Sequence, residues 1–228
     1  MPLLFMGFLQ PSLRSALVEH GYHDANGSEQ AVPGMAVMFS MFLVSNIGVA
    51  FFREHAWNTW ERLRASSMGT GEIMLGKAIA PLLVAVFQFA VLFGVGGRLY
   101  GLAVKGSLLA LLLVEAAFAL CMVSLGLVVV AHCRTLLQVN ALSNLGALIL
   151  AGVAGAVTPS FLLPAWVGAI APGTPGYWAM RGFRTVVVDG GGVREALLPA
   201  GVLVAFAGVL GAVAAVRFRI EAVKVAWA

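Results

Sequence analysis

The chain has 228 residues, of which 61% are hydrophobic and only 11% are charged, and its mean hydropathy is +0.95. Soluble domains carry about a quarter charged and about half apolar residues, so this composition excludes an ordinary soluble domain and indicates an integral membrane protein. The net charge of +4 does not indicate a nucleic-acid partner, because no stripe of Lys and Arg is interleaved with aromatic residues.

The N-terminal segment, residues 1–9, is apolar but shorter than the roughly 20 residues that a helical span needs. We expect it to be a partial first span whose beginning lies upstream of Met1; the alternative is a segment that only dips into the membrane. Residues 10–30 are polar and carry turn signals. Four potential metal ligands occur there: Glu19, His20, His23 and Asp24. Gly21 interrupts the helix that would bring the two histidines together, so we expect no metal site.

Five segments are long and apolar enough to cross a bilayer as helices: residues 32–52, 78–97, 106–131, 136–157 and 196–216. Prolines divide the uncharged run between the last two spans. We expect residues 161–188 to form short re-entrant or interfacial helices on the extracellular side. The prediction is a single-domain, all-α polytopic membrane bundle of five complete transmembrane helices plus the partial first one.

The one long polar interruption of the spans is the segment of residues 53–77. A helix over residues 54–68 has one apolar arc, formed by Trp57, Trp60, Leu63 and Met68. Glu61 and Arg62 fall elsewhere, and only Arg64 interrupts the arc. Such a helix lies at an interface, against a partner protein or, as the alternative, against lipid headgroups that its tryptophans anchor. A slight excess of Lys and Arg on this side of the bundle favours the cytoplasm.

Polar residues inside the spans are candidates for a translocation path. They are Asn46, Gln88, Glu115, Asn140 and Asn144. Glu115 is the only charge in its span, and an intramembrane carboxylate is a functional candidate because it is expensive to bury. The alternative for each residue is a structural role, as a hydrogen-bonding group between helices.

Residues 71–77 match most of a phosphate-binding P-loop, but Ala78 occupies the position that needs Ser or Thr to hold magnesium. No β-strand is expected before this stretch and a span follows it directly, so we expect no ATP site. The glycines are expected to let the chain turn into the span. No Ser/His/Asp set, zinc-ligand array or carboxylate pair is evident, so we expect this chain to have no catalytic site and no bound cofactor.

Two stretches carry a specific resemblance: TWERLRAS with the later LGK (residues 59–66 and 75–77), and LPAWVGAIAPGTPGYW (residues 163–178). In their order relative to the spans they resemble the membrane subunit of type-2 ATP-binding-cassette exporters. This permease family includes bacterial drug and polysaccharide exporters. The resemblance runs from about residue 32 to the C-terminus and says almost nothing about the substrate.

The resemblance implies a permease of the bacterial cytoplasmic membrane that forms a homodimer or heterodimer and pairs with ATPase subunits, where ATP and magnesium bind. It implies a coupling helix that contacts the ATPase through Trp57, Trp60, Glu61, Arg62, Leu63 and Arg64. The short helices of residues 161–184 correspond to the extracellular helices that precede the last span in this family.

The predicted function is ATP-driven export of a drug-like, lipid or glycan substrate. Two alternatives need no partner ATPase: a non-transporting membrane scaffold or immunity protein, and an ATP-independent transporter. The second is disfavoured because the two halves of the chain show no convincing internal repeat.

Overall fold

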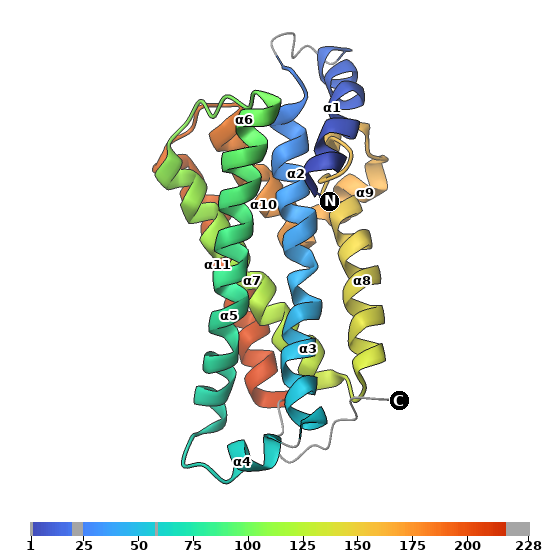
Figure 1. Cartoon of the computed structure of the whole chain (residues 1–228). Coiled ribbons are helices and arrows are strands. Elements are labelled where there is room, and N and C mark those ends of the chain that lie inside the picture. Colours follow the sequence, from blue (N-terminus) through green and yellow to red (C-terminus); the bar gives the residue numbers. More distant parts are fainter. Residues whose placement is uncertain (1, 20–24, 58, 218–228) are drawn as a thin grey trace.

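The computed structural model describes residues 2–19, 25–57 and 59–217 (Figure 1). The regular structure within these ranges is entirely helical. Five helical stretches are long and apolar enough to cross a membrane: Ser28–Glu54, Gly71–Tyr100, Leu108–His132, Leu136–Val153 and Val193–Arg217. The predicted all-helical membrane bundle with five complete spans is therefore confirmed.

In chain order the helices are α1 (Pro2–Glu19), α2 (Ser28–Met41), α3 (Leu43–Ala56), α4 (Trp60–Arg64), α5 (Thr70–Val91), α6 (Gly97–Tyr100), α7 (Leu108–His132), α8 (Leu136–Val153), α9 (Ala165–Ile170), α10 (Pro175–Val187) and α11 (Val193–Arg217). Helices α2 and α3 together form the first complete span. Helix α5, a π-helical turn at Leu92–Gly96 and α6 form the second. The spans alternate between two ends of the bundle, which we call the α4 end and the α9 end (Figure 1).

Helix α7 is the central helix of the bundle, because α11, α3, α10 and α5 all pack against it. Phe118 and Met122 of α7 are fully buried in the main hydrophobic core. Phe89 of α5 stacks on Phe183 of α10 within the same core, with 6.0 Å between the ring centroids. Helices α5, α8 and α11 are much less buried than α7, as suits helices that face lipid or another chain.

Helix α1 runs further than the expected partial span over residues 1–9, because it continues from Gln10 to Glu19. Contacts with α6 hold it in place. Gln10 Nε2 donates to the carbonyl oxygen of Tyr100 at 3.3 Å, and the Tyr100 hydroxyl donates to the carbonyl oxygen of Leu3. The polar residues after residue 9 therefore extend this helix instead of ending it. Three potential metal ligands lie outside the described residues: His20, His23 and Asp24.

The proline-rich stretch between the last two spans forms α9, α10 and two short 3₁₀ turns, Ser160–Leu162 and Ala171–Gly173. Helix α10 packs against α2, α7 and α11. Its apolar side buries Phe183 and Val186, whereas Arg181 and Arg184 are exposed. This one-sided pattern shows that α10 packs its apolar side onto the bundle and leaves its basic side exposed.

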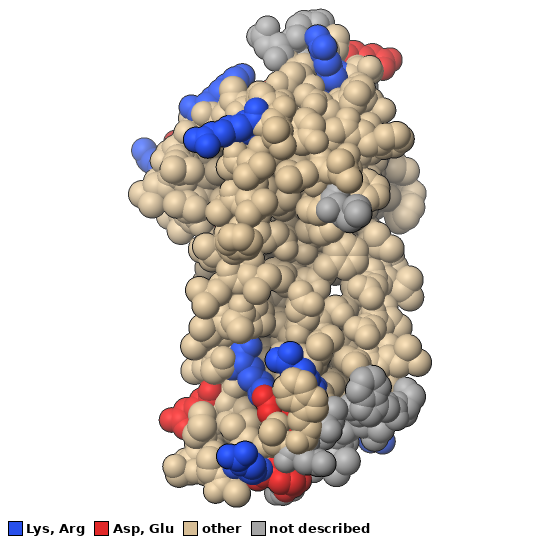
Figure 2. Space-filling model, in the orientation of Figure 1, with Lys and Arg blue, Asp and Glu red and all other residues tan. Residues whose placement is uncertain are grey.

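Charged side chains gather at the two ends of the molecule, and a wide band without visible charge separates them (Figure 2). The band coincides with the middle of the spans. It is the surface expected where hydrocarbon surrounds a protein, because an exposed charge there has no water to solvate it.

Candidate functional site

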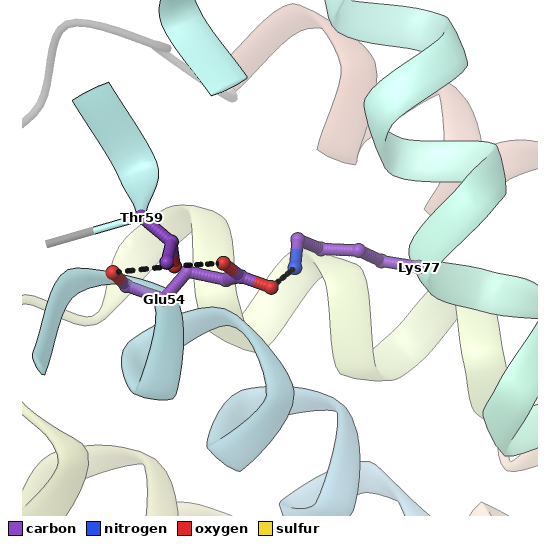
Figure 3. Close-up of polar contacts among 3 residues, drawn as sticks. All are labelled: Glu54, Thr59 and Lys77. Carbon is purple, nitrogen blue, oxygen red and sulfur yellow. Dashed lines mark hydrogen bonds and ion pairs between the residues drawn. The ribbon is translucent and has the colours of Figure 1, made fainter. Parts of the chain in front are cut away.

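The expected single helix over residues 54–68 is interrupted, and this corrects the prediction. Helix α3 ends at Ala56, and α4 begins only at Trp60. The backbone N–H of Thr59 donates to the carbonyl oxygen of Glu54 at 3.1 Å, and its hydroxyl donates to the Glu54 carboxylate (Figure 3). Local bonds of this kind compete with the helical pattern, so they end α3 and let the chain change direction.

The interruption places the two tryptophans in different surroundings. In one continuous helix Trp57 and Trp60 would be neighbours on a face, because they are three residues apart. Instead Trp57 is 66% exposed and Trp60 only 5%. The Trp60 ring lies 6.5 Å from the Phe51 ring, in a cluster that includes Ile73 and Met74 of α5. Trp60 therefore anchors α4 to the bundle, and Trp57 is presented at the surface.

Lys77 ties α5 to the same junction (Figure 3). Its Nζ donates to Glu54 Oε1 at 3.0 Å and lies 5.3 Å from the centroid of the Phe51 ring. The Lys77 side chain is 14% exposed and that of Glu54 is 33% exposed, so water screens the pair only in part. The carboxylate of Glu54 thus joins the end of α3, the beginning of α4 through Thr59, and the first turns of α5. We call this arrangement the α3–α4–α5 junction.

The exposed side of the α3–α4–α5 junction combines aromatic and charged groups. The guanidinium of Arg53 lies over the Trp57 ring, 5.0 Å from its centroid, in a cation–π contact. Glu61 and Arg62 are exposed on α4, and Leu63 is half-buried. The side chain of Arg64, the sixth predicted contact residue, lies outside those that the structure describes.

Sequence reasoning missed three residues of the junction: Glu54, Thr59 and Lys77. A signal was present for the ion pair, because Glu54 and Lys77 are an acid and a base at facing ends of two consecutive spans. Opposite charges in that position pair readily where the helices pack side by side.

The glycines of the P-loop-like stretch do not make the turn that we expected of them. Gly71 and Gly76 both lie inside helix α5. The turn is made earlier, where the N–H of Gly69 donates to Glu72 Oε2 at 2.8 Å and caps the helix. The lysine of the stretch forms the ion pair with Glu54.

The three asparagines among the predicted path residues lie on two packed helices, α3 and α8. Ser45 Oγ donates to Asn140 Oδ1 at 2.7 Å. This hydrogen bond links the two helices, as expected if Asn140 has a structural role. Asn46 and Asn144 are exposed and lie within two of the helical stretches that are apolar enough to cross a membrane. Their role in a path stays a prediction.

The other two predicted path residues are set apart on α5 and α7. Gln88 is half-buried and Glu115 is 2% exposed. Among the described residues, no hydrogen-bond partner is present for Gln88 Nε2 or for either carboxyl oxygen of Glu115. Glu115 is thus enclosed by packed helices, and its interhelical hydrogen bond is not found in the described part of the chain.

Comparison with known proteins finds one family and several relatives. The chain matches the ABC-2 type transporter family over residues 1–188. It is 26% identical over 186 residues to the linearmycin resistance permease protein LnrN of Bacillus subtilis, a match that covers 82% of this chain and 48% of that protein. It is 27% identical over 160 residues to the probable multidrug ABC transporter permease YbhR of Escherichia coli, covering 67% of this chain and 42% of that protein.

The chain spans about half the length of these curated relatives. No solved structure matches it. The family match begins at residue 1, whereas the resemblance read from the residues began at about residue 32. The segment that contains α1 therefore belongs to the matched region.

Proposed function

Because this chain belongs to the ABC-2 type transporter family, we propose that it is the membrane-spanning permease part of an ATP-driven exporter and couples to a separate ATPase subunit. The names of the relatives, a linearmycin resistance permease and a probable multidrug ABC transporter permease, support a role in export. The proposed substrate class is a drug-like, lipid or glycan molecule. The proposed location is the bacterial cytoplasmic membrane, with the α4 end in the cytoplasm and a second permease chain alongside.

The observation that carries the proposal of coupling is the geometry of the α3–α4–α5 junction. Trp57 and Arg53 form an exposed aromatic and cationic surface, and Trp and Arg are the residue types that most often dominate protein–protein contacts. In the same junction, Trp60 is embedded in the bundle and Glu54 is bonded to Lys77 of α5. A force applied at Trp57 is thereby passed to two spans at once.

The proposed mechanism follows from this connection. Closure of the ATPase subunits on ATP pushes the junction, and α3 and α5 tilt together because the Glu54–Lys77 pair and the Trp60 cluster hold them to one another. The tilt opens the permease pair towards the outside. The ATPase supplies the free energy, and this chain supplies two bundle arrangements that the partner favours unequally. The exposed amides of Asn46 and Asn144 are proposed to face the path between the two permease chains.

The test is purification of the tagged chain from its native membranes in detergent, followed by an ATPase assay on the proteins that accompany it. The variant Trp57→Ala removes an exposed ring at the junction. Trp166→Ala is the matched control, because Trp166 is 67% exposed but lies on α9 at the other end of the bundle. We expect the wild-type chain and the control to retain an ATP-hydrolysing partner, and Trp57→Ala to lose it or to lose ATP-dependent transport.

Full transport and partner binding in Trp57→Ala would overturn the assignment of the junction as the docking surface. A wild-type chain that purifies without any ATPase would instead favour the membrane scaffold or the ATP-independent transporter.

A further inference from the structure

A cavity of about 660 Å³ lies at the α9 end of the bundle. Residues from the start of α2, the turn after α8, the loop before α7 and one side of α10 line it. The volume is in the range of small-molecule binding sites. The α3–α4–α5 junction lies at the opposite end (Figure 1), and the predicted path residues do not line this cavity.

Three basic side chains line the cavity: Lys105, Arg181 and Arg184. Within the described part of the chain, neither Lys105 nor Arg181 forms an ion pair with a carboxylate. Arg181 lies instead over the Trp178 ring, 5.2 Å from its centroid. The indole N–H of Trp178 donates to the carbonyl oxygen of Pro172 at 2.8 Å and so fixes the ring that supports the guanidinium. The Arg181 guanidinium is therefore held in position without an ion pair to a described carboxylate.

Two carboxylates, Glu29 and Asp189, also line the cavity. Glu29 Oε2 accepts hydrogen bonds from the backbone N–H groups of Asn26 at 3.2 Å and Gly27 at 3.1 Å. These bonds close the first turn of α2 and engage this carboxylate in capping. Among the described lining residues, Lys105 and Arg181 thus form no ion pair with a carboxylate, and one of the two carboxylates is already bonded to the backbone.

The rest of the lining is largely apolar and aromatic, with Leu17, Phe161, Tyr177, Met180 and Val188. An apolar wall beside Lys105 and Arg181 suits a ligand with a hydrophobic part and an anionic head. Arg and Lys bind phosphate groups well, Arg through paired hydrogen bonds and Lys as a point charge. The cavity lies at the α9 end, and charged side chains gather at the ends of the molecule, where lipid headgroups are expected (Figure 2).

We propose that this cavity binds the phosphate head of an anionic amphiphile, with Lys105 and Arg181 as the charge contacts. The site does not depend on coupling to an ATPase, so its test is independent of the proposed export function.

The experiment measures binding of dihexanoyl phosphatidylglycerol to the purified full chain in an uncharged detergent by titration calorimetry. The double variant Lys105→Gln/Arg181→Gln removes both contacts. Arg98→Gln/Arg194→Gln is the matched control, because it removes the same net charge from exposed positions at the same end of the bundle but outside the cavity. We expect the first variant to bind about tenfold more weakly or worse, and the control to bind within about twofold of the wild type.

Dihexanoyl phosphatidylcholine and inorganic phosphate complete the test. Weak binding of both supports an anionic amphiphile. If inorganic phosphate binds as tightly as the phosphatidylglycerol, the assignment of an amphiphilic ligand is overturned and the cavity is a simple phosphate site. Equal binding of the two lipids, or an equal loss in the control variant, would overturn the proposal. If the double variant does not fold, Lys105→Gln alone decides between these outcomes, because the Lys105 side chain has no hydrogen bond among the described residues.

Discussion

At the scale of single residues, chemically identical side chains have different roles because of what surrounds them. Trp57 and Trp60 are three residues apart in the sequence, but only Trp60 is packed against Phe51 and the start of α5. The exposed ring can contribute to binding with little effect on folding, whereas the buried ring cannot be removed without leaving a cavity. A variant that removes both rings would therefore mix a loss of docking with a loss of stability.

Trp60→Ala is expected to destabilise the purified chain by about 3 kcal/mol, because truncation of a buried aromatic ring leaves a cavity. Trp57→Ala is expected to change the stability by no more than about 0.5 kcal/mol, as is usual for an exposed side chain. Thermal unfolding in detergent, followed by near-ultraviolet circular dichroism, measures both. Equal destabilisation by the two substitutions would contradict the separation into anchor and docking surface.

Glu115 is a second case in which burial changes the interpretation of a residue. An intramembrane carboxylate is a candidate for the transport path. Glu115, however, is buried between α7 and the helices packed on it, and its carboxyl group has no hydrogen-bond partner among the described residues. We expect Glu115→Gln to keep both the stability and the transport activity, because Gln has the same shape and removes only the ionisable group. Loss of transport in a stably folded Glu115→Gln variant would restore Glu115 as a path residue.

At the scale of elements, the close approach of neighbouring segments depends on residues without side chains. A Cβ atom at Gly34 of α2 would lie 1.9 Å from the carbonyl oxygen of Ala156, in the turn after α8. Small residues allow such approaches between membrane helices, where packing rather than hydrophobic transfer holds the helices together. The carbonyl is part of the backbone and cannot rotate away as a flexible side chain would.

Gly34→Ala is therefore expected to lower the stability by about 1–3 kcal/mol, because α2 and this turn must move apart. The control is Gly208→Ala on α11, where no heavy atom lies within 4 Å of the added Cβ. That substitution is expected to be neutral or to stabilise the helix by up to about 1 kcal/mol, through the higher helix propensity of alanine. The unfolding midpoints of the two variants in the same detergent measure this difference in stability. A Gly34→Ala variant as stable as the wild type would refute the close contact.

At the scale of the whole molecule, the proposed function requires a particular orientation in the membrane. The two charged ends are separated by the uncharged band, and α4 and α9 lie at opposite ends (Figures 1 and 2). The proposal places the α4 end in the cytoplasm, where an ATPase can reach Trp57.

The orientation predicts the labelling of two introduced cysteines. Ser67→Cys, in the exposed turn after α4, should react with a membrane-impermeant maleimide only after the cells are permeabilised. Ala169→Cys, exposed on α9, should react in intact cells. The native Cys121 and Cys133 are buried, so the background should be low. The reverse pattern would show that the α4 end faces outwards and would exclude an ATPase partner at the junction.

The sequence by itself determined the fold class. The number of complete spans follows from the lengths of the apolar segments, because hydrocarbon demands about 20 apolar residues per helix whatever the neighbours are. Sequence motifs also indicated the family. The polar segment between the first two complete spans indicated where the junction lies.

Only the tertiary structure decided which residues of that segment are buried. Helical periodicity placed Trp57 and Trp60 on one arc, but Thr59 ends the helix by bonding to Glu54, and Trp60 then packs on α5. In the same way, Tyr100 holds α1 beyond the point where its apolar residues end. Periodicity reports the pattern along one helix, whereas these outcomes depend on partners that are distant in the sequence and are brought close only by packing.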